Sequence, residues 1–319
     1  MFKHSRKFAN PLFVLFRLIL SLTMFVILIF GGYSAYKHFS GLDPLKLDPQ
    51  ALISKLKLPT SLPSDIIPKS SEETQEESAP ALFSFLLIAD THNDNKNLSK
   101  AIAQAKSNYP NLAFIIGLGD YTEIGTLNEL RAVKKELDSS GLRYFVVPGD
   151  HDLWESRDRQ LDPRNNFRIV FGPSYQSFNF QNYKFILIDN SDNYKGIERG
   201  QSSWITSELE NSKKEGIVGI LVFLHEPLYH PSSDRSMGKV EKSLKTQADA
   251  LIYELKQIEV KGVFAGDIHY YSEYNEPVTN ISMYTNGAVV TERNPQLPRY
   301  TIVSVLEDGT LRVDDVEIN

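Results

Sequence analysis

From Ala81 to Gly266, short apolar segments alternate with longer segments whose apolar residues recur at helical spacing. The apolar segments have strand length and are rich in β-branched and aromatic residues. Strands are expected at 83–89, 112–118, 142–147, 184–188, 217–224 and 262–265. Helices are expected at 97–107, 127–137, 201–212 and 245–257. Strands that alternate with helices predict an α/β domain built on a parallel or mixed sheet.

Two parts of the chain depart from this alternation and predict antiparallel pairs. The short segment 177–180 precedes the strand at 184–188 closely enough to form a hairpin. At the end of the chain, 281–285, 300–306 and 311–316 are expected as antiparallel strands. Asp308-Gly309 supplies the turn between the last two.

Carboxylates and histidines follow directly after five of these apolar segments. The clusters are Asp90-x-His92, Gly119-Asp120, Gly149-Asp150-His151-Asp152, His225 and Gly266-Asp267-x-His269. Ligand sites of α/β sheets collect at the carboxyl ends of strands. Mixed carboxylate and imidazole donors suit Mn, Fe or Zn ions. One such cluster alone is more often an ordinary polar turn, but the ordered set of five predicts a shared metal site.

The central cluster carries the strongest electrostatic argument. An apolar strand from Tyr144 to Val147 ends at Pro148 and Gly149, and an Asp-His-Asp sequence follows. These titratable groups are expensive to hold near further carboxylates unless a cation neutralises them. The cluster therefore favours a bound cation over a solvated loop.

The ordered set resembles the calcineurin-like metallophosphoesterase superfamily, whose motifs run D-x-H, G-D, G-N-H-[DE], H and G-H-x-H. The resemblance extends from Phe83 to the end of the chain, and Gln201-x-x-Trp204 and His225-Glu226-Pro227 agree with it. It implies that residues 81–319 form an α/β domain, a four-layer α/β/β/α sandwich of two mixed sheets flanked by helices.

The resemblance also implies a site with two metal ions and a role for each residue. Asp120 would bridge the ions, and a hydroxide between them would attack phosphorus. His151 would protonate the leaving oxygen or stabilise charge, with Asp152 orienting it. The ligands of the first ion would be Asp90, His92 and His269, and those of the second ion Asp150, His225 and Asp267. Substrate-binding residues stay unassigned.

Two residues depart from the family motifs, and both belong to the second ion. Asp150 stands where the family has Asn, and Asp267 stands where it has His. The four carboxylates then cancel the formal charge of two divalent ions. We expect two divalent or trivalent ions, first of all Mn²⁺ or Fe, with Zn²⁺ or Ca²⁺ as alternatives, and a weakened attraction for a phosphate dianion. The alternative is that the second ion is lost.

The first part of the chain predicts a membrane anchor. Residues 1–17 are basic without acidic residues, and Leu18–Tyr36 is free of charge and long enough to approach the thickness of a bilayer. Gly31–Ala35 offers only an ambiguous cleavage site, so an uncleaved signal anchor is favoured over a cleaved signal peptide. The basic segment 1–17 should stay in the cytoplasm and the rest outside it. Residues 37–80 are rich in Pro and acidic residues and are expected as an extracytoplasmic linker.

Together, the resemblance and the uncharged segment 18–36 imply a membrane-anchored, metal-dependent phosphoesterase that acts on small phosphomonoesters or phosphodiesters. One alternative is hydrolysis of lipid-linked or nucleotide-sugar pyrophosphates. Another is a non-catalytic, metal-containing domain that binds a phosphorylated ligand, although His151 argues against it. The net charge of −6 argues against a nucleic-acid partner. With 0 Cys, thiolate ligands and disulfides are excluded.

Several side chains that flank the motifs are candidates for the pocket wall, although ordinary packing is expected for most. They are Tyr121, Trp154, Arg157, Tyr229, His230, Tyr270 and Tyr271. The purple acid phosphatases, a branch of the superfamily, place a metal-binding Tyr three residues after the bridging Asp. This chain has Glu123 there, so no purple charge-transfer centre is expected.

Overall fold

In a computed structural model of the chain, the structure describes residues 23–24, 30, 79–213 and 216–319. The predicted basic segment 1–17 lies outside these residues, as do nearly all of the predicted span 18–36 and of the linker 37–80. Within the described residues, no helix has both the length and the apolar character needed to cross a bilayer.

Sheet A, as we name the first of two sheets, has five strands in the order β11-β10-β1-β2-β3. The strand β1 runs parallel to β2, which runs parallel to β3, whereas β10 and β11 are antiparallel additions beside β1. The bounds are β1 (Ala81–Ile88), β2 (Leu112–Gly117), β3 (Arg143–Val146), β10 (Arg299–Leu306) and β11 (Leu311–Glu317).

Sheet B has six strands in the order β4-β5-β6-β7-β9-β8. Its four inner strands are parallel, and the edge strands β4 and β8 are antiparallel to their neighbours. The bounds are β4 (Gln176–Phe180), β5 (Tyr183–Leu187), β6 (Gly219–Phe223), β7 (Gly262–Ala265), β8 (Ser272–Asn275) and β9 (Ser282–Thr285). The expected hairpin is therefore present as β4 and β5.

The expectation of an antiparallel tail was right for β10 and β11 and wrong in part for β9. The strand β9 pairs with β7 in parallel, and only its other edge carries an antiparallel partner, β8. That partner was not predicted because its sequence, Ser-Glu-Tyr-Asn, is short and polar. The tail strands are consequently divided between the two sheets.

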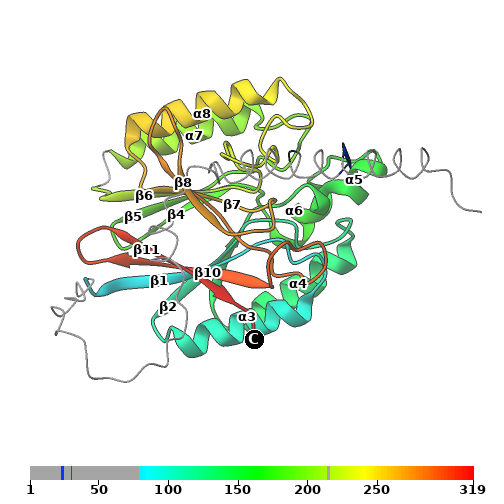
Figure 1. Cartoon of the computed structure of the whole chain (residues 1–319), viewed down its shortest axis with the longest axis horizontal. Helices are drawn as coiled ribbons and strands as arrows, with labels where there is room; N and C mark the ends of the chain where they lie inside the picture. The colour runs from blue at the N-terminus through cyan, green and yellow to red at the C-terminus, as the bar shows by residue number, and fades with distance from the viewer. Residues whose placement is uncertain (1–22, 25–29, 31–78, 214–215) are drawn as a thin grey trace, which may run out of the picture. The chain divides into compact units, whose positions relative to one another are not determined.

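Helices cover the outer face of each sheet (Figure 1), so the predicted four layers are present. The helices α3 (Asn95–Asn108) and α4 (Leu127–Ser139) lie on sheet A, and α7 (Arg199–Ser212) and α8 (Leu244–Ile258) lie on sheet B. Three short helices after β3 were not predicted. They are η1 (His151–Leu153), α5 (Trp154–Asp158) and α6 (Asn165–Phe171).

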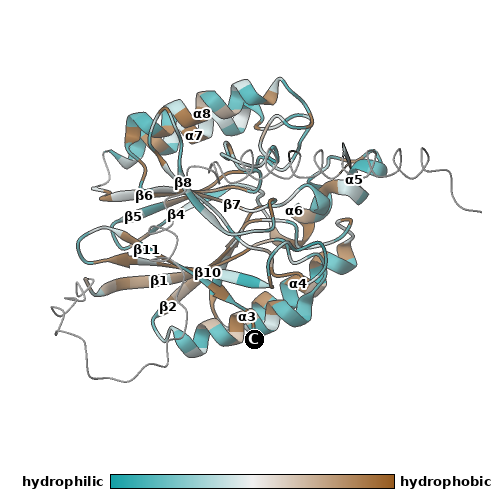
Figure 2. Cartoon of the chain, in the orientation of Figure 1, coloured by the Kyte–Doolittle hydropathy of each residue, from teal (hydrophilic) through white to brown (hydrophobic). Residues whose placement is uncertain are grey.

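Alternation along β1 shows how the layers are held together. Phe83, Phe85 and Leu87 belong to the apolar core between the sheets, whereas Leu86 and Ile88 pack in the core beneath α3 and α4. A third core joins sheet B to α7 and α8. In Figure 2 the hydrophobic colour follows the strands and the helix faces turned toward them, and the outer helix faces are hydrophilic.

Candidate dinuclear metal centre

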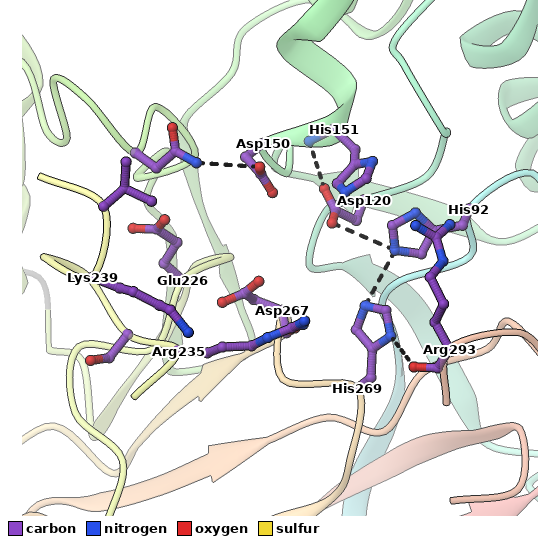
Figure 3. Close-up of a pocket in the computed structure, with 13 residues that line it drawn as sticks. His92, Asp120, Asp150, His151, Glu226, Arg235, Lys239, Asp267, His269 and Arg293 are labelled. Atoms are coloured by element: carbon purple, nitrogen blue, oxygen red, sulfur yellow. Dashed lines mark hydrogen bonds and ion pairs between the residues drawn. The ribbon is translucent and has the colours of Figure 1, made fainter. Parts of the chain in front are cut away.

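The parallel strands of both sheets deliver polar side chains to one edge of the sandwich. Asp90, Asp120 and Asp150 follow β1, β2 and β3, which end at the same edge of sheet A. His225 and Asp267 follow β6 and β7 of sheet B. The structure brings together all seven side chains that the sequence assigns to metal ions (Figure 3 labels five of them).

The seven side chains form two groups with metal-ligand spacing. One group contains Asp90, His92, Asp120 and His269, and the other contains Asp150, His225 and Asp267. Within each group the candidate ligand atoms all lie within 4.8 Å of one another. The division is the one that the family resemblance implies for a first and a second ion. His151 belongs to two further groups with metal-ligand spacing, so a role as a metal ligand competes with its predicted role as a proton donor.

Asp120 faces both groups at once. Its Oδ2 atom lies 3.6 Å from Nε2 of His92, and its Oδ1 atom lies 3.5 Å from Nε2 of His225. The main-chain N–H of His151 donates to the same Oδ1 atom at 3.0 Å and fixes the carboxylate. A buried carboxylate that offers one oxygen to each group is arranged as a bridging ligand.

Two glycines allow this close approach. A Cβ atom on Gly149 would lie 2.1 Å from Oδ1 of Asp120, and one on Gly119 would lie 2.7 Å from Nδ1 of His225. Gly119 also has a φ of +95°, which disfavours any side chain. The glycines in the G-D and G-D-H-D motifs therefore make room for the candidate ligands.

Main-chain carbonyls hold two of the histidines. Nδ1 of His225 donates to the carbonyl oxygen of Leu118 at 2.7 Å, and Nδ1 of His269 donates to that of Arg293 at 3.1 Å. A carbonyl oxygen can only accept, so each ring carries its proton on Nδ1. Nε2 of each neutral ring is left as a lone pair for the site, as in known metal centres.

Some buried polar atoms of the site have no hydrogen-bond partner, and a bound cation would coordinate them. Oδ2 of Asp90 and Nε2 of His225 are buried without a hydrogen-bond partner in the described part of the chain. Burial raises the pKa of Asp120 well above its usual range, and the nearby carboxylates of Asp150 and Asp90 add to this effect. This donor set fits divalent ions.

The histidine pKa values point the same way. Burial, followed by the charges of His151 and His269, lowers the pKa of His92 to about 2, so its ring is neutral as a ligand must be. Burial also lowers the pKa of His225, but the carboxylates around it, Asp120 first, outweigh burial and raise that pKa well above its usual value. The cause of this rise is the negative charge that surrounds His225, which would equally attract a cation.

Several candidate ligands hold an unusual backbone conformation. A left-handed φ occurs at Asp90, His92, Asp120, Asp267 and His269. This conformation is rare in residues other than glycine. It is concentrated at functional sites, where the surrounding structure holds the backbone in place. Here the main-chain N–H of Asp90 donates to Gly119, and that of His92 donates to Asp120. The strain is concentrated at the turns that present ligands.

The expected role of Asp152 in orienting His151 was wrong. The buried Asp152 carboxylate instead accepts hydrogen bonds from the main-chain N–H groups of Tyr121, Thr122 and Gly149 and from the Thr122 hydroxyl. Nδ1 of His151 lies 2.8 Å from the carbonyl oxygen of Glu123. Asp152 joins two ligand-bearing turns, because a carboxylate there meets donors on every side.

A cavity of about 290 Å³ opens over the two groups. The flanking side chains considered from the sequence do not contribute to its wall. Trp154 stacks on the His151 ring at 3.8 Å, and Tyr121 is fully buried. The wall contains instead Asn193, Glu226, Arg235, Ser236, Lys239, Val240 and Arg293. Sequence reasoning missed the three cations because no spacing marks them.

Glu226 is an acidic wall residue that adds little negative charge. Its carboxyl is largely buried, and burial, followed by the charge of Asp267, raises its pKa to about 8. The group is therefore mostly protonated at neutral pH. Its Oε2 atom has no hydrogen-bond partner among the described residues.

Comparison with known proteins agrees with this geometry. The profile of the family described as calcineurin-like phosphoesterase matches residues 83–271, which is more than half of the chain. The chain belongs to the calcineurin-like phosphoesterase family. Membership makes it a hydrolase of the phosphoesterase type, and the family uses divalent metal ions. The resemblance seen in the sequence is thus confirmed.

Two relatives of this phosphoesterase-family chain are named as a phosphodiesterase and a phosphatase. The 3',5'-cyclic-nucleotide phosphodiesterase of Nostoc sp. is 23% identical over 214 residues, which cover 63% of this chain and 75% of that protein. The serine/threonine-protein phosphatase CPPED1 of Homo sapiens is 22% identical over 183 residues, which cover 55% and 57%. The chain therefore spans little more than half of the phosphatase.

Two solved structures share the fold of this chain. GAP50, described as the anchor in the inner membrane complex of Plasmodium, superposes with a TM-score of 0.54 at 16% identity, covering 75% of this chain and 86% of that one. The purple acid phosphatase PPD1 from yellow lupin (Lupinus luteus) seeds has a TM-score of 0.54 at 12% identity, covering 74% and 51%. At these identities the likeness concerns the fold alone.

Proposed function

We propose that the chain is a dinuclear metal-dependent phosphoesterase that hydrolyses phosphomonoesters or phosphodiesters. The observation that carries this proposal is the position of Asp120, with one carboxylate oxygen toward each group of candidate ligands. The named relatives support both classes of ester, since one is a phosphodiesterase and one a phosphatase.

The proposed ligands are the seven residues of the two groups, with Asp120 shared. Two bound ions would polarise the phosphoryl oxygens and lower the pKa of a nucleophilic water. Mn²⁺ or Fe is proposed first, because Asp150 and Asp267 replace neutral ligands with carboxylates, which prefer harder ions.

His151 is proposed as the general acid. The Glu123 carbonyl fixes its Nδ1 atom, and the ring lies between Trp154, on which it stacks, and His92, 4.7 Å away. This contact directs Nε2 away from Glu123, and Nε2 can donate a proton when the ring is charged. His151 also lines the cavity, where a leaving oxygen would be within its reach.

The location of the enzyme is a separate proposal. The uncharged segment 18–36, preceded by the basic residues of 1–17, supports a single membrane anchor with the catalytic domain outside the cytoplasm. A test would combine alkaline carbonate extraction with protease accessibility of the domain on intact cells. Extraction of the full chain into the soluble fraction would contradict the anchor, and protection of the domain would contradict its orientation.

The activity is tested with the full chain stripped of metal ions. Turnover of an aryl phosphomonoester and the matching diester would be measured after addition of Mn²⁺, Fe, Zn²⁺, Ca²⁺ or Mg²⁺, beside the variant His151→Ala. We expect turnover that returns with Mn²⁺ or Fe and collapses in the variant. A folded chain that binds two ions but hydrolyses neither ester would favour a non-catalytic phospho-ligand binding domain. A single Zn²⁺ with full activity would contradict the charge argument for the second site.

A further inference from the structure

We propose that Arg235 binds a second anionic group beside the reacting phosphoryl group. The preferred substrates would then carry two neighbouring anions, as in a diphosphate ester or a phosphoester with an adjacent carboxylate. This inference rests on the proposed phosphoesterase function and names the substrate class of the same site.

Arg235 differs from the other two cations of the wall in its partners. The Arg293 guanidinium is paired with Glu123 at 2.5 Å, and Nζ of Lys239 is paired with Asp234 at 2.7 Å. Among the described residues, no carboxylate oxygen lies within ion-pairing distance of the Arg235 guanidinium. Its charge is therefore the one that a ligand can engage without first breaking an ion pair.

The guanidinium is aimed at the second group of candidate ligands. Nη1 of Arg235 donates to the main-chain oxygen of Asp267 at 3.0 Å. Figure 3 shows Arg235 and Lys239 reaching toward Asp267 from one side of the cavity, with Arg293 beside His92 and His269. A guanidinium has five N–H donors, so most of the Arg235 fork stays available for a carboxylate or phosphate.

The loop that carries Arg235 is held at both ends. Nδ1 of His230 accepts from the main-chain N–H groups of Ser232 and Ser233, at 3.2 and 2.9 Å. On the other side, the main-chain N–H of Met237 donates to Pro227, and the Met237 side chain is fully buried in the core of sheet B. Arg235 lies between these two anchors, so the backbone that carries the cation is held in place, and the hydrogen bond to Asp267 directs its exposed side chain.

The charge of the site explains why such a cation is needed. With two divalent ions bound, Asp90, Asp120, Asp150 and Asp267 would be ionised, and their four negative charges would cancel the charge of the ions. Little net attraction for a phosphate dianion is left, and even less for a substrate with more negative charge. The Arg235 guanidinium beside the ions would attract an anionic group at its own position. It would therefore favour substrates whose second anionic group lies next to Arg235.

The test compares matched substrates on the full chain at a fixed concentration of free Mn²⁺. The substrates are phenyl phosphate, phenyl diphosphate and 2-carboxyphenyl phosphate, so that a phosphate and a carboxylate are separated as the second anion. The variants are Arg235→Gln, Arg235→Lys and the control Arg131→Gln, which removes an exposed arginine of α4. Binding of inorganic pyrophosphate and of inorganic phosphate is measured by calorimetry on the same proteins.

We expect the full chain to bind pyrophosphate more tightly than phosphate, and Arg235→Gln to reduce that preference by roughly 10- to 100-fold, the range for a charged hydrogen-bonded contact. The KM for phenyl phosphate divided by the KM for a doubly anionic ester should also fall in Arg235→Gln. The ratio should be intermediate in Arg235→Lys and unchanged in Arg131→Gln. Equal binding of the two anions by the full chain would overturn the inference, as would a loss in Arg235→Gln that is the same for every ligand. If no ester is hydrolysed, the proposed function fails, and the binding measurements still decide the role of Arg235.

Discussion

Nδ1 of His151 lies 2.8 Å from the main-chain carbonyl oxygen of Glu123, three residues after the shared carboxylate Asp120. The turn after β2 thereby positions both the candidate bridging ligand and the candidate proton donor. Because the contact is made by a main-chain atom, the side chain at position 123 is free to pair with Arg293. The proposed general-acid role of His151 can therefore be tested separately from metal binding.

Replacement of His151 by Gln should lower kcat by roughly 10²- to 10⁴-fold on an alkyl phosphate, because an alkoxide needs a proton to leave. The loss should be much smaller on p-nitrophenyl phosphate, whose leaving group is stable as an anion. The measurement is kcat across esters of differing leaving-group pKa, with metal content determined in parallel. A variant that has lost an ion would assign His151 to one of the competing ligand groups instead.

Replacement of Asp152 by Asn should reduce stability rather than alter the pH profile of catalysis. Both carboxylate oxygens accept hydrogen bonds, so an amide NH₂ would face main-chain donors of Tyr121, Thr122 or Gly149. The free energy of unfolding should fall by roughly 1.5–3 kcal/mol, measured by denaturant titration. Asp158→Asn, at an exposed position of α5, is the matched control and should change little. An unchanged stability with a shifted pH profile would restore the role expected from the sequence.

Removal of metal ions should destabilise the chain, because the buried carboxylates then face one another without a cation. Each ion should add roughly 2.7 kcal/mol to the free energy of unfolding at a free concentration 100 times its Kd. Thermal unfolding with chelator and with Mn²⁺ measures the effect. Asp120→Asn should reduce the stabilisation by Mn²⁺ and make the metal-free chain more stable than its parent, because a buried carboxyl with a raised pKa is removed. A metal response equal to that of the parent would exclude Asp120 as a shared ligand.

Replacement of Gly149 by Ala should disrupt the centre by steric overlap alone. The added Cβ would lie 2.1 Å from Oδ1 and 2.2 Å from the main-chain N of Asp120, and the backbone of Asp120 would have to move. We expect a loss of roughly 1–3 kcal/mol in stability and weaker metal binding. Gly200→Ala is the control, because nothing lies within 4 Å of its Cβ and α7 should gain roughly 0.5–1 kcal/mol. Calorimetric titration with Mn²⁺ separates the two variants, and normal Mn²⁺ binding by Gly149→Ala would show that the turn can relax.

The order of strands and helices could be read from the sequence because its physical cause is local. Apolar runs such as Phe114–Ile116 and helical spacing such as Leu98, Ala101 and Ile102 reflect burial that each element needs wherever it lies. The polar strand β8 escaped prediction, because its pairing with β9 comes from the edge of a sheet and not from its own composition.

The role of Asp152 and the cations of the cavity wall show the opposite case. Asp152 follows His151 directly, but the sharp turn sends its carboxylate toward Tyr121 and Thr122, on a turn remote in the sequence. Arg235 and Arg293 come from separate loops that meet only when both sheets are in place. Contacts of this kind depend on loop paths, which side-chain spacing does not encode.

The sequence by itself determined the fold class and, through its resemblance to a known family, the set of candidate metal ligands, because parallel strands must bring their carboxyl ends to one edge and each candidate ligand follows such a strand. Only the tertiary structure decided which atoms face which. It directs the two oxygens of Asp120 toward two different histidines and places the Glu123 carbonyl oxygen beside Nδ1 of His151. It also leaves Arg235 without an ion-pair partner among the described residues, beside the main-chain oxygen of Asp267. The physical reason is one of range. Burial and backbone direction are properties of a segment, whereas a site depends on distances of a few ångströms between segments far apart in the chain.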